Sequence, residues 1–488
     1  MKILFIYSVE RPLSVIKPLG SPLYIQFGIS YLSSFLKQSG HDTKLLILSK
    51  SFVNKNYGII RKKIENFKPD IIGFYSVTSQ YKFISDTAEF IKSNYPEIFL
   101  IIGGPHATLN PEKTADDNFD AICIGDGEMP MLELTNMLKK SEFPSKIKNL
   151  WIKKNGIIEK NQTAPFNENI DSLPFPDRTI WEEHIDYIPN FLEKNISILL
   201  GRGCPYSCSY CCNHALRKIA DGNYVRFRSP QNIIEEIKLI HEKYFQENNI
   251  YLEIESFSSN KGWAVKVCDE IEKYNKSLDV PLRFDLNIRI TANADFDILF
   301  EACKRANITH LNIGLESGSE RVRKNILQRN YSNSDVIKTV NLAKKYELNY
   351  NFFVMIGIPG ETTEDFKETI RICRICQPKE IYLSIFYPYP GTDLYKLCKK
   401  MNLLQEEMDI KIERRFAIIN MPDFDKKQIQ RNYRWFNYYI YKGYKSKIKL
   451  ILNMIINFLR LNNFIDLMLT KFFRLNYSHL YTFIKPYQ

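Results

Sequence analysis

Three cysteines lie close together in the stretch Gly201-Arg-Gly-Cys204-Pro-Tyr-Ser-Cys208-Ser-Tyr-Cys211. Their spacing, Cys-x3-Cys-x2-Cys, supplies three thiolates from one short loop. A [4Fe-4S] cluster that only carries electrons is normally held by four cysteines, so a three-cysteine site leaves one iron for another ligand. The alternative is a structural zinc site with Cys212 or His214 as the fourth ligand, although zinc sites favour cysteine pairs at two- to four-residue spacing. The stretch therefore favours a cluster that takes part in chemistry.

The same stretch, with Tyr210 directly before the last cysteine, resembles the signature of the radical S-adenosylmethionine (radical SAM) enzymes. The resemblance implies that Cys204, Cys208 and Cys211 hold a [4Fe-4S] cluster. It also implies that the amino and carboxylate groups of SAM chelate the open iron, and that one-electron reduction cleaves SAM to a 5′-deoxyadenosyl radical. The motif does not identify a substrate.

Length and composition agree with a multidomain globular protein. A chain of 488 residues suggests about two or three domains, and its 44% hydrophobic content excludes a disordered protein. The seven cysteines outside the motif are scattered and show no disulfide framework, which predicts a reducing cytoplasm. The apolar run after Met1-Lys2 is too short for a signal peptide and is predicted to be a buried strand.

Residues 1–140 are predicted to form a doubly wound, Rossmann-like α/β domain. Short apolar runs at 3–7, 44–48, 71–75, 99–102 and 121–124 alternate with helical periodicity, as at 24–38 and 81–94. Apolar runs without polar alternation indicate parallel strands covered on both faces. Ligands bind such sheets at the carboxyl ends of the strands. Two glycine clusters fall there, Gly103-Gly104-Pro105-His106 and Gly125-Asp126-Gly127-Glu128.

Taken alone, these clusters are also typical of plain connections. Together with Gly40-His41-Asp42 they resemble the cobalamin-binding domain that precedes the radical SAM domain in one branch of that family. The resemblance implies cobalamin contacts from Gly103, Gly104, His106, Gly125, Gly127 and Glu128. The chain lacks the Asp-x-His-x-x-Gly motif whose histidine binds cobalt in cobalamin-dependent mutases and methionine synthases. His106 is therefore not assigned as a cobalt ligand, and a loop histidine bonded to backbone is the alternative.

Residues 141–195 are interpreted as an ordered linker, because the prolines of Leu173-Pro-Phe-Pro-Asp177 exclude helix and central strand. Residues 196–402 are predicted to form a partial (β/α)6 barrel. The apolar runs that indicate it lie at 196–200, 250–254, 284–288, 311–315, 351–356 and 381–386. Such barrels place their chemistry in loops at the carboxyl ends of the strands. The cysteine loop begins just past the first run, whereas a zinc ribbon would lie in a hairpin.

The other strand ends carry residues that fit SAM, which needs acceptors for an ammonium group and ribose hydroxyls, and a donor for its carboxylate. By resemblance, Glu316 and Ser317 would contact the ribose or methionyl group, and Arg289 the carboxylate. Gly357, Pro359 and Tyr210 would border adenine, and Glu255 is a further SAM-binding candidate. The alternatives are a helix-capping turn at 357–361 and a solvated strand-end arginine at 289. The loop 387–392, Tyr-Pro-Tyr-Pro-Gly-Thr, suits closing over a substrate or corrin ring, with a proline-stiffened turn as the alternative.

The last region, 403–488, is predicted to be helical, basic and aromatic. From Lys426 onward it holds 12 Lys or Arg against one acidic residue, Asp466, so its net charge is +11 (12 − 1) in a chain of +12. It is interpreted as a helical cap on the barrel or as an interfacial helix in peripheral contact with an anionic membrane. Nucleic-acid binding is not expected, because no motif of that class is present. The uncharged stretch 450–459 is about half of what a bilayer span requires.

These features predict a cobalamin-binding radical SAM enzyme that methylates an unactivated carbon of a small molecule or natural-product intermediate. The resemblance also implies a low-potential electron donor of the flavodoxin or ferredoxin type. Cyclisation, ring rearrangement or oxidation is the alternative within the family, and a non-catalytic metal- or cobalamin-binding module is the alternative from another class. Methylthiotransferases are excluded, because their N-terminal domain carries three cluster cysteines and here that domain holds only Cys123.

Overall fold

The computed structural model describes residues 1–9, 25–50, 53–184, 196–244, 249–404 and 413–459. These residues form two compact units. Within the described ranges, the first unit comprises residues up to 206 and 211–232, and the second comprises 207–210 and residues from 233 onward. Both units are α/β, as the sequence predicts.

The first unit is built on a seven-stranded sheet with the order β2-β1-β3-β4-β5-β6-β7. Five strands are parallel: β1 (Lys2–Val9), β2 (Asp42–Ser49), β3 (Ile71–Tyr75), β4 (Phe99–Gly103) and β5 (Ala121–Cys123). They coincide with the five apolar runs, which confirms the predicted doubly wound sheet. The winding direction changes at β1, which pairs with β2 on one side and β3 on the other. Ligands bind such sheets beyond the strand ends at this switch point.

Strands β6 (Leu150–Lys154) and β7 (Ile157–Lys160) extend the sheet as an antiparallel hairpin that the apolar runs do not predict. Its turn is Asn155-Gly156, with φ angles of 51° and 78°. An Asn-Gly pair in this left-handed conformation is the preferred two-residue hairpin turn. That dipeptide is the sequence signal from which the hairpin could have been found.

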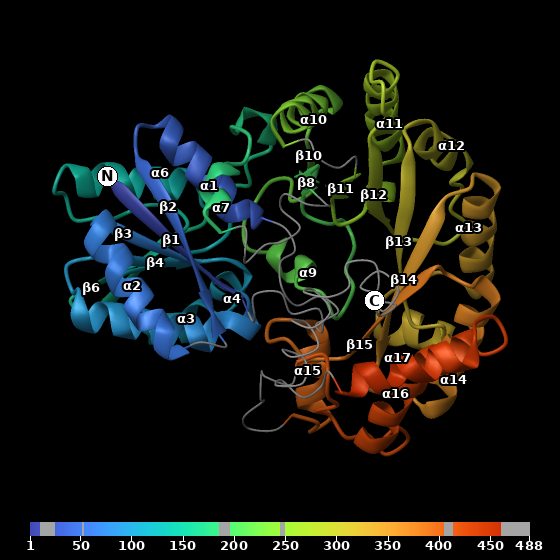
Figure 1. Cartoon of the computed structure of the whole chain (residues 1–488). Coiled ribbons are helices and arrows are strands. Elements are labelled where there is room, and N and C mark those ends of the chain that lie inside the picture. The colour runs from blue at the N-terminus through green and yellow to red at the C-terminus, as the bar shows by residue number, and fades with distance from the viewer. Residues whose placement is uncertain (10–24, 51–52, 185–195, 245–248, 405–412, 460–488) are drawn as a thin grey trace. The chain divides into compact units, whose positions relative to one another are not determined.

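Helices cover both faces of the first sheet (Figure 1). α1 (Phe27–Gln38) and α6 (Glu128–Lys139) lie on one face, and α2 (Val53–Phe67), α3 (Thr78–Asn94), α4 (Pro105–Leu109) and α5 (Pro111–Ala115) lie on the other. Ile6, Ile72 and Ile102 of the strands pack in one core with Ile64 of α2 and Ile84 of α3. This two-sided cover is the reason why the strands lack polar alternation.

The second sheet has six strands in the order β15-β14-β13-β12-β11-β8. These are β8 (Ile196–Leu199), β11 (Asn249–Glu253), β12 (Arg283–Ile288), β13 (Ile308–Glu316), β14 (Asn349–Ile356) and β15 (Glu380–Ile385). The pairs from β11 to β15 are all parallel. The intervening helices are α10 (Pro230–Tyr244), α11 (Lys261–Asn275), α12 (Asp297–Arg305), α13 (Asn333–Lys345) and α14 (Thr363–Cys376). The strands match the six predicted runs of the partial barrel.

The two faces of this sheet differ in chemistry. On β13, Leu311, Ile313 and Leu315 are fully buried, whereas Asn312 and Glu316 on the other face are half-buried. α13 and α14 begin with capping boxes, in which Ser332 pairs with Asp335 and Thr362 with Asp365. One face of the strands therefore forms a core, while the opposite face and the strand ends are left for polar groups.

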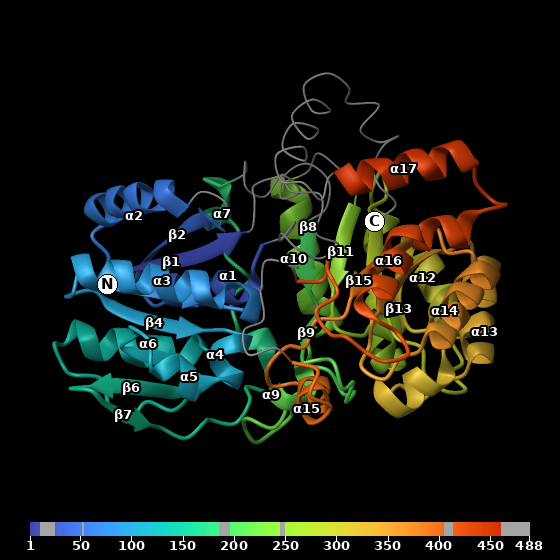
Figure 2. The same cartoon turned by 90° about the horizontal axis from the view of Figure 1, so that it is seen from below.

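The C-terminal region is helical as predicted. α15 (Asp393–Lys400) is followed by α16 (Lys426–Tyr441) and α17 (Lys447–Leu459), which lie side by side (Figure 2). α16 packs on α14 through Phe366 and Phe436, whose ring centroids are 5.5 Å apart. In the described part of the chain, no helix combines the length and apolar character needed to cross a membrane. The predicted basic tail beyond residue 459 lies outside the described residues.

Candidate functional site

The cysteine loop runs between strand β9 (Gly201–Arg202) and helix α9 (Asn213–Leu216). β9 pairs with β10 (Arg226–Phe227), and their backbones are so close that two glycines are required. A Cβ at Gly203, whose φ is +84°, would lie 2.2 Å from the carbonyl oxygen of Tyr224. A Cβ at Gly201 would lie 2.6 Å from the carbonyl oxygen of Arg226. The glycines of the motif therefore anchor the loop that carries the cysteines.

None of the three motif cysteines forms a disulfide, and neither does any of the other seven. Cys208 is buried, whereas Cys204 and Cys211 are half-buried. Within the described ranges, no three or more His, Cys, Asp or Glu side chains are gathered closely enough to hold a metal ion. The three thiols thus lie on one loop but are not close enough together to bind one metal ion. Three cysteine thiols on one anchored loop are nevertheless the donor set that an iron–sulfur cluster uses.

Two arginines of the second unit face Cys208. Arg289, which follows β12, donates from Nη1 to the Sγ of Cys208 at 2.6 Å. Its backbone is held by Ser258, whose hydroxyl accepts from the Arg289 N–H at 3.0 Å and donates to its carbonyl at 2.9 Å. Nη1 of Arg329 lies 4.0 Å from the same sulfur. Two guanidinium groups therefore lie beside the sulfur of Cys208.

Arg329 is not among the predicted site residues, yet it holds several of them together. Its Nη1 donates to the hydroxyl of Tyr210 at 2.9 Å and lies 3.4 Å from Oε1 of Glu316. Its Nη2 donates to the carbonyl of Gly314 at 2.5 Å. Burial acts to lower the pKa of Arg329, but Tyr210, Tyr331 and Glu316 outweigh it and the pKa is raised well above its usual value. The guanidinium is therefore a fixed, buried positive charge.

The end of β13 has a backbone geometry that directs Glu316 toward Arg329. Glu316 adopts a left-handed φ of 61°, and the pairing register shifts between Gly314 and Glu316. Ser317 points elsewhere: its hydroxyl is buried, lies 3.4 Å from that of Thr369 on α14 and accepts from the N–H of Ser319 at 3.2 Å. Of the two predicted neighbours, Glu316 therefore faces the arginine and Ser317 supports the strand end.

The loop after β14 is a tight turn organised by Glu361. The buried carboxylate accepts hydrogen bonds from the N–H groups of Gly357 and Ile358 at 2.7 and 3.2 Å. Burial raises the pKa of Glu361 to about 8, although both N–H bonds act to lower it. Gly357 has a φ of +79°, and Pro359 continues the turn before Thr362 caps α14. The turn thus has the helix-capping architecture that was the alternative interpretation.

Two carboxylates lie at the end of β11. Glu253 is the last residue of β11, and Glu255, which is exposed, follows two residues after the strand ends. Burial, and secondarily the neighbouring Glu255, raise the pKa of Glu253 to about 7. Two carboxyl groups thus lie close in sequence at this strand end, one on the strand and one just past it.

The aromatic loop after β15 is held at both ends. Tyr389 donates to Glu413 and accepts from Nε of Arg414 at 2.8 Å, and its ring lies 5.1 Å from that of Tyr387. Immediately after the loop, the N–H of Leu394 donates to the carbonyl of Ser209 at 2.9 Å. Within the second unit, the predicted loop therefore adjoins the cysteine loop.

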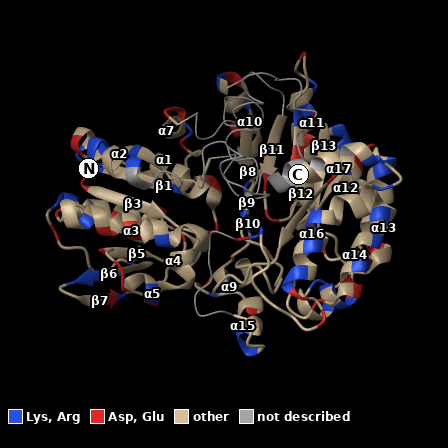
Figure 3. Cartoon of the chain, turned by 60° about the horizontal axis from the view of Figure 1, so that its bottom comes forward, with Lys and Arg blue, Asp and Glu red and all other residues tan. Residues whose placement is uncertain are grey.

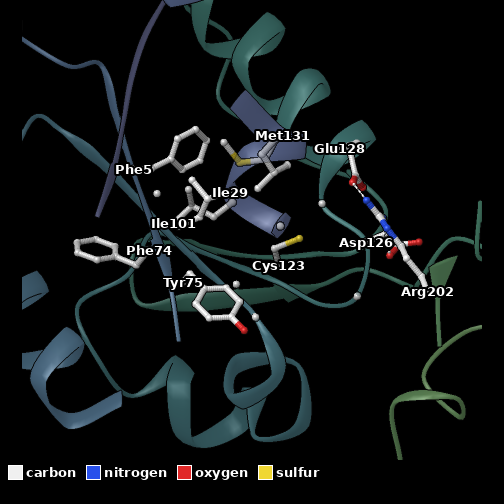
Figure 4. Close-up of a pocket in the computed structure, with 17 residues that line it drawn as sticks. Phe5, Ile29, Phe74, Tyr75, Ile101, Cys123, Asp126, Glu128, Met131 and Arg202 are labelled. Carbon is white, nitrogen blue, oxygen red and sulfur yellow. Dashed lines mark hydrogen bonds and ion pairs between the residues drawn. The ribbon is translucent and has the colours of Figure 1, made fainter. Parts of the chain in front are cut away.

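The first unit contains a cavity of about 250 Å³ at the carboxyl ends of its strands (Figure 4). Six glycines line it: Gly28, Gly73, Gly103, Gly104, Gly125 and Gly127. A Cβ at Gly104 would lie 2.8 Å from the carbonyl oxygen of Ser76, and one at Gly127 would lie 3.3 Å from Leu32. Phe5, Tyr75 and Met131 supply much of the remaining wall. Because these glycines have no side chains, an apolar space is left at the switch point of the sheet.

Charged groups gather at one end of this cavity (Figure 4). Arg202 of β9 donates to Oε1 of Glu128 at 2.6 Å and to Oδ1 of Asp126 at 3.3 Å, and Arg226 donates to Oδ2 of Asp126 at 2.5 Å. Burial acts to raise the pKa of Asp126, but the two arginines outweigh it and lower the pKa. The glycine-rich loop after β5 is thereby tied to the β9–β10 hairpin that anchors the cysteine loop.

His106 lies on α4 outside the cavity lining, unlike Gly103, Gly104, Gly125, Gly127 and Glu128. Its ring stacks on Tyr81 at 4.0 Å, and its Nδ1 lies 3.2 Å from the hydroxyl of Thr78. Burial lowers the pKa of His106 to about 4. The ring is therefore a neutral packing group in α4, held by a threonine side chain.

Two family models match the chain. The radical SAM superfamily model matches residues 198–373, which include the cysteine loop and Arg329. The B12 binding domain model matches residues 22–135, which include most of the cavity lining.

Three curated proteins show similarity over most of the chain. An uncharacterized methyltransferase, PH0819, of Pyrococcus horikoshii is 28% identical over 80% of this chain and 81% of its own. Anaerobic magnesium-protoporphyrin IX monomethyl ester cyclase of Rubrivivax gelatinosus is 24% identical over 75% and 65%. Hopanoid C-3 methylase of Methylococcus capsulatus is 23% identical over 75% and 67%. A solved structure of OxsB, a cobalamin-dependent S-adenosylmethionine radical enzyme, matches with a TM-score of 0.69 at 16% identity and covers 97% of this chain and 75% of that one.

Proposed function

Because the chain belongs to the radical SAM superfamily and carries a B12 binding domain, we propose that it methylates an unactivated carbon of a small molecule. The observation that supports this most strongly is the presence, on one chain, of the cysteine loop and of a glycine-lined cavity at the switch point of a doubly wound sheet. In this proposal residues 1–140 bind cobalamin, and residues 196–402 bind the cluster and SAM. Residues 141–195 are the linker between these two domains, and residues 403–488 form the helical C-terminal region.

Cys204, Cys208 and Cys211 would hold the [4Fe-4S] cluster. When bound, the cluster supplies the electron that cleaves SAM to a 5′-deoxyadenosyl radical, and cobalamin supplies the methyl group. The chain's own contribution is positioning and charge. Arg289 fixes the Cys208 sulfur at 2.6 Å, and the glycines of β9 fix the loop on which the thiols lie.

Arg329 is the residue best suited to the SAM carboxylate. A guanidinium offers several donors in a fixed fork, and this one is already buried and charged next to Tyr210 and Glu316. Glu316 would then accept from the ammonium or the ribose hydroxyls, and Tyr210 would lie beside the adenine. Arg289, which donates from Nη1 to Cys208, stays a second predicted contact of the carboxylate.

The cavity of the first unit would hold part of the cobalamin. At about 250 Å³ it is smaller than a corrin ring and suits a flat aromatic portion such as the cofactor's benzimidazole base. Gly103, Gly104, Gly125 and Gly127 would allow the cofactor to approach the backbone, and Glu128 is held at the rim by Arg202. His106 is turned toward Tyr81 and would make no bond to cobalt.

Methyl transfer is favoured over ring closure by two of the relatives, a methyltransferase and a methylase, whereas the third is a cyclase. We expect a low-potential donor of the flavodoxin or ferredoxin type to reduce the cluster. Ten cysteines without a disulfide among them favour a reducing compartment, so a cytoplasmic location is proposed.

The reaction class is tested with reconstituted, reduced protein supplied with SAM and cobalamin. A methylase uses one SAM as a methyl donor, so S-adenosylhomocysteine should form only when cobalamin is bound, in addition to 5′-deoxyadenosine. The matched control is Gly103→Val, which is designed to fill the cavity. Formation of 5′-deoxyadenosine without cobalamin-dependent S-adenosylhomocysteine would favour cyclisation or oxidation. Absence of both products from a cluster-loaded protein would leave only a non-catalytic binding module.

A further inference from the structure

Helix α17 displays an apolar stripe on the outside of the second unit. Ile448 is 73% exposed, Ile451 43%, Leu452 52% and Ile455 48%. Their spacing of three, four and seven residues places all four on one side of the helix. Leu450, by contrast, is 4% exposed. In a water-soluble helix the stripe with this spacing normally faces the core, so its outward direction needs an explanation.

The turn that precedes α17 is held by α14. Arg374 on α14 donates from Nη1 to the carbonyls of Tyr439, Ile440 and Lys442 at 2.8, 2.9 and 3.1 Å. Its guanidinium also lies 5.1 Å from the ring of Tyr444. These bonds satisfy the carbonyls at the end of α16, which otherwise have no partner in a helix. The turn from which α17 starts is therefore fixed to α14.

Positive charge lies at the N-terminal end of the stripe. Lys442 and Lys447 are exposed in the turn and at the first position of α17, and the exposed ring of Tyr444 lies between them. The sequence of α16 and α17 contains no Asp or Glu, and the basic residues of α16 are visible in Figure 3. An interfacial helix typically carries aliphatic side chains on one face, with lysines beside them and an aromatic ring at the boundary. This segment has the same composition.

We propose that this face of α17 binds the surface of an anionic bilayer. Lipid headgroups would pair with Lys442 and Lys447, while the four aliphatic side chains would enter the boundary between headgroups and acyl chains. A second copy of the chain fits less well, because two copies of this face would bring lysines together with no Asp or Glu from α16 or α17 to pair with them. A nucleic acid would meet the lysines but would leave the aliphatic side chains in water. This inference does not depend on the reaction that the protein catalyses.

The test is co-sedimentation of the full-length protein with vesicles of phosphatidylcholine alone or mixed with phosphatidylglycerol. We expect binding only to the mixed vesicles, because the lysines need anionic headgroups. The double variant Ile451→Asn/Leu452→Asn should lower the bound fraction at least tenfold. The double variant Lys442→Gln/Lys447→Gln should abolish the preference for phosphatidylglycerol. The matched control, Ile298→Asn, changes an aliphatic side chain on α12 that is 71% exposed and should bind as the unaltered protein does.

Because the substituted side chains are exposed, all variants should melt at the temperature of the unaltered protein. Failure of the unaltered protein to sediment with the mixed vesicles would overturn the proposal. So would equal binding by Ile451→Asn/Leu452→Asn. A dimer that this variant dissociates, in the absence of vesicle binding, would identify a second copy as the occupant and would also overturn it.

Discussion

Arg329 is the residue on which the proposed SAM site depends most. Lysine would keep the positive charge but lose the fork that reaches Tyr210, Glu316 and the Gly314 carbonyl together. We expect Arg329→Lys to weaken SAM binding by roughly tenfold or more, because a charge-assisted hydrogen bond contributes about 1.5–3 kcal/mol. Isothermal titration of the cluster-loaded protein with SAM measures this. Arg321→Lys, at a half-exposed ion pair with Asp365, is the control and should leave the affinity unchanged. Unchanged affinity in Arg329→Lys would remove Arg329 from the site.

Glu361 gives the fold a specific pH dependence. Its pKa is raised from 4.5 to about 8 in the folded state, so between these values the folded protein holds a proton that the unfolded chain has lost. The contribution of Glu361 to the free energy of unfolding therefore falls as pH rises through that interval, and it levels off above about pH 8. Glu361→Gln is neutral throughout, so its melting temperature relative to the unaltered protein should rise between pH 5.5 and 8. A constant difference across that range would show that Glu361 is ionised in the folded protein.

At the scale of elements, the cysteine loop depends on the close approach of β9 to the chain before β10. Gly203→Ala places a Cβ 2.2 Å from the Tyr224 carbonyl at a φ of +84°, so the backbone must shift. We expect most of the iron and sulfide of the reconstituted cluster to be lost. Gly222→Ala is the matched control, because its φ of +88° is equally strained but its nearest atom is 3.5 Å away. Equal cluster content in the two variants would show that strain alone, and not the contact with Tyr224, determines how the loop forms.

The strand end at Gly103 should determine cobalamin binding. A Cβ added at Gly103 would lie 3.5 Å from its nearest neighbour, the Cβ of Cys123, which is an ordinary contact distance. The φ angle of Gly103 is not in the left-handed region. Gly103→Val should therefore fold while placing two methyl groups at the cavity wall. We expect at least tenfold weaker cobalamin binding by absorbance titration, with a melting temperature close to that of the unaltered protein. Gly58→Ala, in open space on α2, should bind normally. Normal binding by Gly103→Val would place cobalamin elsewhere.

At the scale of the whole molecule, the two sheets could be predicted because their strands are continuous apolar runs, as at β3 and β14. Four of the six cavity glycines, at 103, 104, 125 and 127, could be predicted because they lie at or just after strand ends, whereas Gly28 on α1 and Gly73 within β3 could not. Arg329 could not, since nothing local distinguishes it from other arginines and its partner Tyr210 is 119 residues away. The contacts of Arg202 with Asp126 and Glu128, separated by 76 and 74 residues, are hidden for the same reason. Long-range charge pairing is decided by packing, which one sequence does not display.

Reductive cleavage of SAM by the reconstituted protein tests the central claim most directly. The claim is that Cys204, Cys208 and Cys211 hold a cluster whose open iron binds SAM. Anaerobic protein with a full cluster, reduced with dithionite and given SAM, should release 5′-deoxyadenosine, measured by liquid chromatography and mass spectrometry. The triple variant Cys204→Ala/Cys208→Ala/Cys211→Ala should release none. No 5′-deoxyadenosine from the fully loaded, reduced protein, or equal amounts from the triple variant, would contradict the account.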